Sequence, residues 1–169
     1  GLFDSLYAGG SCLTKDARSL AHQLQSAGVD TRLVTEPYDA NKRQLELFIR
    51  RYEAESSQSW KGKKVALLGT SFKRDTNDVR NSPSEYIVRT LASAGVESIA
   101  VHDFAGIKNF QSLVSDESTC TFSEDVRDAL TGVDVCIIST DWPQYRSIAP
   151  LVVQEMNTGS VVMDGRRIL

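Results

Sequence analysis

The first third of the chain spaces its apolar residues as helices do. Residues 14–28 repeat apolar side chains every three to four positions, and Gly28 is a suitable residue to end a helix. Thr14 is predicted to cap this helix, and Asp16 is expected in its first turn, where a negative charge suits the helix dipole. A second helix is predicted after Asp39, because the chain there carries a stripe of apolar side chains: Leu45, Phe48, Ile49 and Tyr52.

From residue 63 onward, short apolar runs alternate with helical segments. Four runs have the length and composition of buried strands: residues 65–68, 99–101, 135–138 and 161–163. Ser82 is predicted to cap one intervening helix, with Pro83 at its first position and Glu85 closing a capping box. Ser123 is predicted to cap another helix, which ends at Gly132. Strands that alternate with helices predict a parallel sheet with right-handed crossover connections.

The break between these two patterns predicts the domain organisation. Residues 56–59 read Ser-Ser-Gln-Ser, a polar interruption typical of a boundary. We therefore expect a helical segment over residues 1–58 and an α/β, Rossmann-like domain over residues 59–169.

Composition and charge argue against several classes of function. The formal net charge is -3, and no basic stripe indicates binding to nucleic acid or to an anionic membrane surface. No apolar run is long enough to span a bilayer, and residues 1–5 lack the basic and apolar regions of a signal peptide. The cysteines, Cys12, Cys120 and Cys136, are far apart and have no metal-ligand spacing. This sparse set favours a reducing cytoplasm over a disulfide framework, and no metal site is expected.

Polar and charged residues follow the predicted strands, at the edge where open parallel sheets bind ligands. Lys73 follows the first strand and Arg166 the last, so both are expected to face one crevice, with Trp142 in its wall. Arg80 comes just before the helix that begins near Ser82. Cationic side chains beside a helix N-terminus favour a phosphate group as the ligand.

The ligand of this domain is not expected to be a dinucleotide. After the first strand the sequence reads Gly69-Thr70-Ser71-Phe72, without the second glycine that close approach to a pyrophosphate needs. Asp103 ends the second strand, where a dinucleotide fold places its ribose acceptor. Without the glycine fingerprint, a loop-capping role for this aspartate is favoured.

Three motifs give the chain a specific resemblance. Residues 9–16 read GGSCLTKD, residues 72–83 read FKRDTNDVRNSP, and residues 164–167 read DGRR. In this order they resemble the cysteine, phenylalanine-lysine and C-terminal arginine motifs of the UDP-glucose/GDP-mannose dehydrogenase family. The cysteine motif is most similar to its UDP-glucose 6-dehydrogenase branch. The chain departs from the family at residues 4–8, which lack the usual glycine- and phenylalanine-rich stretch, and at Thr14, where proline is common.

The resemblance implies a role for each matching residue. Catalysis is expected from Cys12 as the nucleophile, and from Asp16 as the group that positions a water or the general base. Substrate binding is expected from four residues: Gly9, Phe72, Lys73 and Arg166. Contacts toward an NAD cofactor are expected from two cationic residues: Lys15 and Arg80.

The resemblance also implies an activity. Family members oxidise the primary alcohol of a UDP-hexose to a carboxylate in two hydride transfers to NAD, through a cysteine thiohemiacetal and thioester. For this chain, UDP-glucose oxidation to UDP-glucuronate in polysaccharide biosynthesis is expected, with the main NAD-binding domain outside the chain. A homodimer is expected through the helical segment, with the apolar stripe at its interface. A GDP-mannose or UDP-N-acetylhexosamine dehydrogenase, and a non-catalytic nucleotide-sugar-binding or dimerisation module, are the alternatives.

Overall fold

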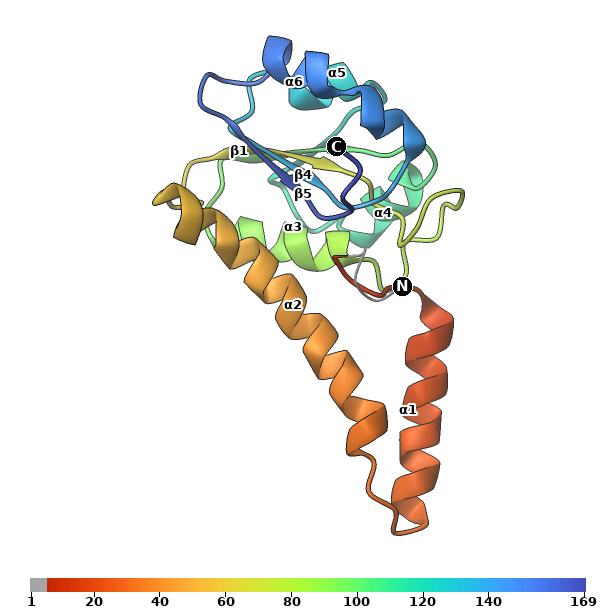
Figure 1. The fold of residues 1–169 in the computed structure, drawn as a ribbon. Coiled ribbons are helices and arrows are strands. Elements are labelled where there is room, and N and C mark those ends of the chain that lie inside the picture. The colour runs from red at the N-terminus through yellow and green to blue at the C-terminus, as the bar shows by residue number, and fades with distance from the viewer. Residues whose placement is uncertain (1–5) are drawn as a thin grey trace.

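The computed structural model describes residues 6–169 as a parallel sheet with helices on both faces and a helical hairpin that projects from it (Figure 1). The sheet has five strands in the order β3-β2-β1-β4-β5, and all neighbouring pairs are parallel. The strands are β1 Lys64–Leu68, β2 Ser98–His102, β3 Cys120–Phe122, β4 Val135–Ile138 and β5 Val161–Asp164. The predicted α/β class and parallel sheet are confirmed, and β3 adds a short strand to the predicted four. The expectations about residues 1–5 fall outside the described residues.

Alternate residues of the central strand β1 enter two different cores. Val65 and Leu67 pack on one face beneath α3 (Pro83–Ser93) and α4 (Ile107–Leu113). Ala66 and Leu68 pack on the opposite face with the helices there, namely α5 (Val126–Leu130), η1 (Pro143–Ser147) and α6 (Ala149–Glu155). Because both faces are covered, β1 is apolar at successive positions, as expected of a strand in a parallel sheet.

Two predicted helix starts need correction. Ser82 does cap α3 by accepting a hydrogen bond from the Ser84 amide, but Glu85 closes no capping box. Its carboxylate instead accepts a hydrogen bond from Arg89 one turn later, 3.1 Å away. At α5 the cap is Asp125 and not Ser123, because the aspartate carboxylate reaches the amide of Arg127 at 2.8 Å.

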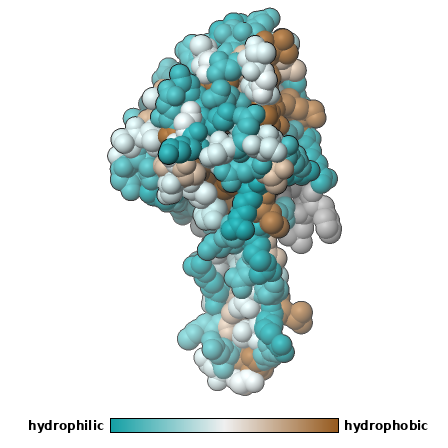
Figure 2. All heavy atoms as spheres, turned by 90° about the vertical axis from the view of Figure 1, so that its left-hand side faces the viewer, coloured by the Kyte–Doolittle hydropathy of each residue, from teal (hydrophilic) through white to brown (hydrophobic). Residues whose placement is uncertain are grey.

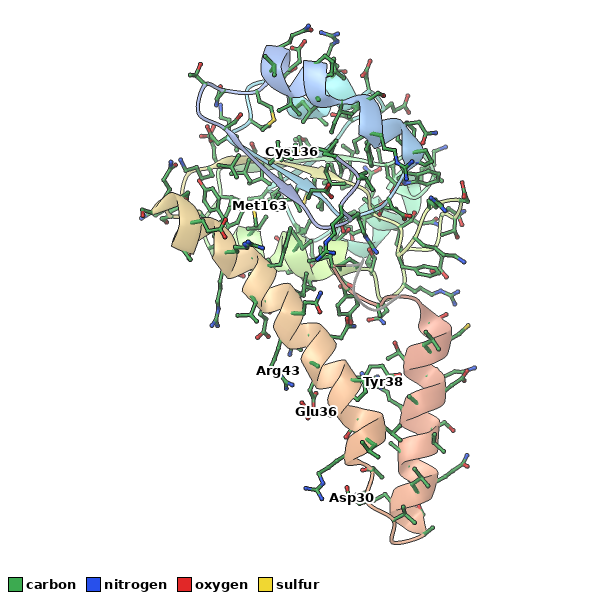
Figure 3. The ribbon with its side chains drawn as sticks, in the orientation of Figure 1. Asp30, Glu36, Tyr38, Arg43, Cys136 and Met163 are labelled. Atoms are coloured by element: carbon green, nitrogen blue, oxygen red, sulfur yellow. The ribbon has the colours of Figure 1, made fainter. Side chains whose placement is uncertain are left out.

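The hairpin consists of α1 (Ser11–Ser26) and α2 (Arg32–Ser56). Both helices begin earlier than predicted: α1 at Ser11, and α2 at Arg32, with Pro37 inside it. The Tyr38 side chain ties the two helices together by donating to the Leu13 carbonyl at 2.6 Å (Figure 3). No residue of α1 is buried, and the hairpin forms a narrow, mainly hydrophilic stalk in the view of Figure 2. Among residues 6–169, no helix combines the length and the apolar character needed to cross a bilayer.

The apolar stripe of α2 belongs to the core of the same chain, and the expectation that it forms a subunit interface is wrong. Leu45, Ile49 and Tyr52 are buried, and Phe48 packs partly buried against the same cluster. This happens because the C-terminal half of α2 lies along the sheet domain beside α3 (Figure 1). The core therefore extends across the predicted boundary at residue 58. The homodimer remains a prediction, but this stripe is not available to it.

Candidate active site

A glycine turn places Cys12 in the first turn of α1. Gly10 has φ 90°, a left-handed conformation that glycine adopts without strain, and the helix begins at the next residue. Thr14 is therefore not the cap, and its hydroxyl instead donates to the Gly10 carbonyl at 3.3 Å. Cys12 is exposed within the first turn and does not precede it as expected. Its thiol lies where the helix dipole favours negative charge.

The two charged residues of the cysteine motif lie one turn further along α1. Lys15 and Asp16 follow Cys12 by three and four positions, so the three side chains share one side of the helix. Asp16 is outside the first turn, which corrects its predicted place. Lys15 and Asp16 form an ion pair at 3.6 Å, and both side chains are exposed. Both charged groups are therefore accessible to a ligand or to another protein surface.

The glycine turn packs against the loop that carries the phenylalanine-lysine motif. A side chain on Gly9 would lie 2.5 Å from the Asn81 carbonyl oxygen and 3.0 Å from the Phe72 Cβ atom. The Phe72 ring lies equally close to the position of a Gly10 side chain. The absence of a side chain at Gly9 thus leaves space for Asn81 and Phe72 of the same chain. The expected approach of the Gly9 backbone to a sugar stays a prediction. Lys73 is exposed, with its ammonium 5.4 Å from the centre of the Phe72 ring.

Arg80 reaches the same region from the other end of this loop. Its guanidinium pairs with Asp78 at 2.7 Å, and its backbone amide binds the same carboxylate at 2.9 Å. The pKa of Arg80 is raised, first by this hydrogen bond and in smaller part by the charge of Cys12. The guanidinium therefore lies close enough to Cys12 for their charges to interact, and its contact with a cofactor stays a prediction.

Arg166 ties the carboxyl ends of three strands together. Its Nε donates to the Ser139 carbonyl at 2.6 Å and its Nη2 to the Phe72 carbonyl at 3.2 Å. Burial lowers the pKa of this guanidinium. The backbone beside it is fixed too, because the Leu6 amide donates to the Gly165 carbonyl at 2.8 Å. The segment before the cysteine and the arginine motif are thus neighbours, although they stand at opposite ends of the chain.

The turn after β1 does not fit a dinucleotide. The Asp103 carboxylate already accepts hydrogen bonds from the Thr70 and Ser71 amides, at 2.6 and 3.2 Å, where a pyrophosphate would lie. Its other oxygen accepts from the Ala105 and Gly106 amides at 2.8 and 2.7 Å. The Trp142 indole completes the set at 3.2 Å, its ring is buried in the core on that face of the sheet, and its place in a crevice wall stays a prediction. The loop-capping role of Asp103 is therefore confirmed, and the Thr70 and Ser71 amides of this turn are already occupied by its carboxylate.

Two asparagines at this site carried no clear signal in the sequence. Asn81 has φ 52°, and its side chain contacts Tyr7, Gly10 and Thr14. Asn41 of α2 binds both backbone groups of Ala8. A left-handed asparagine just before a Ser-Pro helix start is a recognisable pattern, but its partners lie too far away in sequence to be read from it. A hollow of about 340 Å³ opens beside the start of α1 and is lined by Gly10, Ser11, Thr14, Lys15, Arg18 and Asn81.

Comparisons with known proteins find relatives that match nearly the whole chain. The chain is 29% identical over 160 residues to the UDP-glucose 6-dehydrogenase TuaD of Bacillus subtilis, a match that covers 95% of this chain and 34% of that protein. It is 28% identical over 165 residues to the UDP-glucose 6-dehydrogenase AglM of Haloferax volcanii, with 95% of this chain and 36% of that protein covered. The chain thus spans about a third of the length of these relatives.

Solved structures show the same fold. A UDP-glucose dehydrogenase from the archaeon Pyrobaculum islandicum superposes with a TM-score of 0.83 at 28% identity, over 97% of this chain and 35% of that one. A GDP-mannose dehydrogenase from Pseudomonas aeruginosa superposes with a TM-score of 0.79 at 21% identity, over 99% and 38%. Residues 66–169 match the model of the UDP binding domain of the UDP-glucose/GDP-mannose dehydrogenase family, and the chain therefore belongs to that family.

Proposed function

We propose that this chain is the substrate-binding and nucleophile-bearing part of an NAD-dependent UDP-glucose 6-dehydrogenase. One observation carries the proposal: the turn that bears Cys12 packs directly against the Phe72 loop, close to the partly buried guanidinium of Arg166. The relatives named above as UDP-glucose 6-dehydrogenases support the choice of sugar. A nucleotide-sugar held by this loop and by Arg166 would have its sugar end near the thiol.

The proposed chemistry assigns covalent catalysis to Cys12. Its thiolate adds to the carbon of a sugar aldehyde, and the aldehyde oxygen takes up a proton to give a thiohemiacetal. NAD bound outside this chain would supply both oxidations, by accepting one hydride from the primary alcohol to give the aldehyde and a second from this adduct to give the thioester. Water then attacks the thioester carbon, which releases the carboxylate and returns the thiol. Asp16, one turn from Cys12, would position that water, and Lys15 and Arg80 would reach toward the cofactor.

Calorimetric titration tests the substrate and the role of Arg166. We expect UDP-glucose to bind more tightly than GDP-mannose or UDP-N-acetylglucosamine. Arg166→Ala should weaken UDP-glucose binding by about 1.5–3 kcal/mol, because the charged hydrogen bond proposed between the guanidinium and the bound nucleotide-sugar is lost. Arg167→Ala is the matched control, since Arg167 lines a different hollow beside α2. Unchanged affinity in Arg166→Ala would remove this arginine from the site, and tighter binding of GDP-mannose would move the chain to another branch of the family.

The chain by itself is expected to reduce no NAD when UDP-glucose is added. Hydride transfer needs the nicotinamide held against the sugar, and positioning of this kind supplies a large share of the rate. The turn where a Rossmann-like domain would seat the dinucleotide is filled by Asp103. The appearance of NADH absorbance is the measurement. Steady turnover by the purified chain would show that the cofactor binds here after all.

A further inference from the structure

Asn41 holds the backbone of the segment that leads into Cys12. Its side chain accepts a hydrogen bond from the Ala8 amide at 2.8 Å and donates one to the Ala8 carbonyl at 3.1 Å. The asparagine thus binds both polar groups of one residue, as a neighbouring strand would in a sheet. Asn41 lies on α2, four residues before the buried Leu45, so the grip on Ala8 is anchored in the domain core.

Asn81 holds the same segment through a second set of hydrogen bonds. Its amide nitrogen donates to the Gly10 carbonyl at 3.1 Å and to the Thr14 hydroxyl at 2.8 Å. Its side-chain oxygen accepts from the Tyr7 hydroxyl at 3.0 Å. Both amide hydrogens are therefore used, and the two donated bonds fall on either side of Cys12.

We propose that Asn41 and Asn81 are positioning residues that fix the Cys12 thiol relative to the nucleotide-sugar, an inference that rests on the proposed function. Gly9, and Gly10 whose carbonyl Asn81 binds, follow Ala8 directly and have no side chains of their own to restrict the backbone. A nucleophile must be held about 3–3.5 Å from the atom it attacks, and displacement by about 1 Å can cost about a hundredfold in rate. The two amides supply this restraint without contacting the sugar.

Hydrogen exchange in the ligand-free chain measures the restraint directly. The test variants are Asn41→Ala and Asn81→Gly, where glycine accepts the left-handed backbone that alanine would strain. Asn41→Ala removes two hydrogen bonds and Asn81→Gly removes three, so exchange of the backbone amides of residues 8–14 should be at least about tenfold faster. Asn109→Ala is the control. The Asn109 side chain also donates to a backbone carbonyl, that of Asn77 in the loop of residues 72–83, at 2.8 Å, but it makes no hydrogen bond to residues 8–14.

Protection of Cys12 against alkylation then separates positioning from simple loop stability. At ten times its Kd, UDP-glucose leaves about one chain in eleven free, so a thiol shielded in the complex should react with iodoacetamide about tenfold more slowly. In Asn41→Ala and Asn81→Gly we expect UDP-glucose to bind with the same Kd but to protect Cys12 less than about threefold. Asn41→Asp keeps the acceptor for the Ala8 amide and should restore part of the protection.

The outcomes are distinct. Faster exchange together with lost protection at unchanged Kd supports the inference. Exchange and protection in both variants equal to those of Asn109→Ala would overturn it. If UDP-glucose neither binds the unmodified chain nor protects its Cys12, the proposed function fails. Unchanged hydrogen exchange in the two variants would then refute, separately, the restraint that Asn41 and Asn81 place on the Cys12 segment.

Discussion

Replacing Asp103 by alanine should destabilise the chain by about 3–5 kcal/mol, because five donors lose their common acceptor. Four of these are backbone amides from two loops, and the fifth is the indole of Trp142. The carboxylate is nearly buried, at 6% exposure, so water cannot fully replace it. Thermal unfolding should show a midpoint lower by roughly 10 °C.

Two further variants make this result interpretable. Asp103→Asn keeps the shape but turns an NH₂ group toward amides that are themselves donors, so it should also destabilise. Asp125→Ala removes an exposed aspartate that caps α5 with one hydrogen bond and should cost only about 1 kcal/mol. Equal stability in Asp103→Ala and Asp125→Ala would show that the two loops do not depend on the carboxylate.

Iodoacetamide should label Cys12 about a hundredfold faster than Cys120, and faster still than Cys136. Burial raises the pKa of the Cys120 thiol to about 11 and that of Cys136 to about 12. At pH 8 roughly one Cys120 thiol in a thousand and one Cys136 thiol in ten thousand are ionised, and only the thiolate reacts. Cys12 is exposed at the start of α1, so its thiol is not subject to this burial.

Peptide mass spectrometry after timed labelling gives the three rates separately. Cys12→Ser should leave a chain that incorporates almost no label over the same period, which serves as the control. Labelling of Cys120 at a rate similar to that of Cys12 would mean that the sheet edge at β3 opens in solution, and it would remove the argument for a uniquely accessible nucleophile.

Much of the sheet domain follows from local patterns. Apolar runs bounded by glycine predict β1, β2, β4 and β5, because a strand covered on both faces must be apolar throughout. The same logic fails at α5, where Ser123 and Asp125 are both acceptable caps and only the final backbone path selects the aspartate. It fails at α1 for a related reason: a capping rule favours Thr14, but the left-handed turn at Gly10 begins the helix four residues earlier.

The candidate site was only partly predictable. The three motifs identify Cys12, Phe72 and Arg166, and the fold places them near one another. The contacts that fix their geometry join Asn41 to a residue 33 positions away and Asn81 to one 71 positions away. No periodicity encodes such pairs. The stripe on α2 was misassigned because periodicity shows that a face needs burial but does not show what covers it.

The continuity of α2 has a mechanical consequence. This helix of 25 residues is roughly 38 Å long, with its C-terminal half fixed in the domain core and its N-terminal half in the projecting hairpin. Asn41 lies between the two halves, and only Pro37, nearer the tip, interrupts the ladder of backbone hydrogen bonds. Asn41 therefore holds Ala8 from a position just outside the buried stretch that begins at Leu45, where the anchored half of the helix passes into the projecting half. A displacement of the hairpin tip would be transmitted along this one continuous helix to the residue that holds the backbone before Cys12.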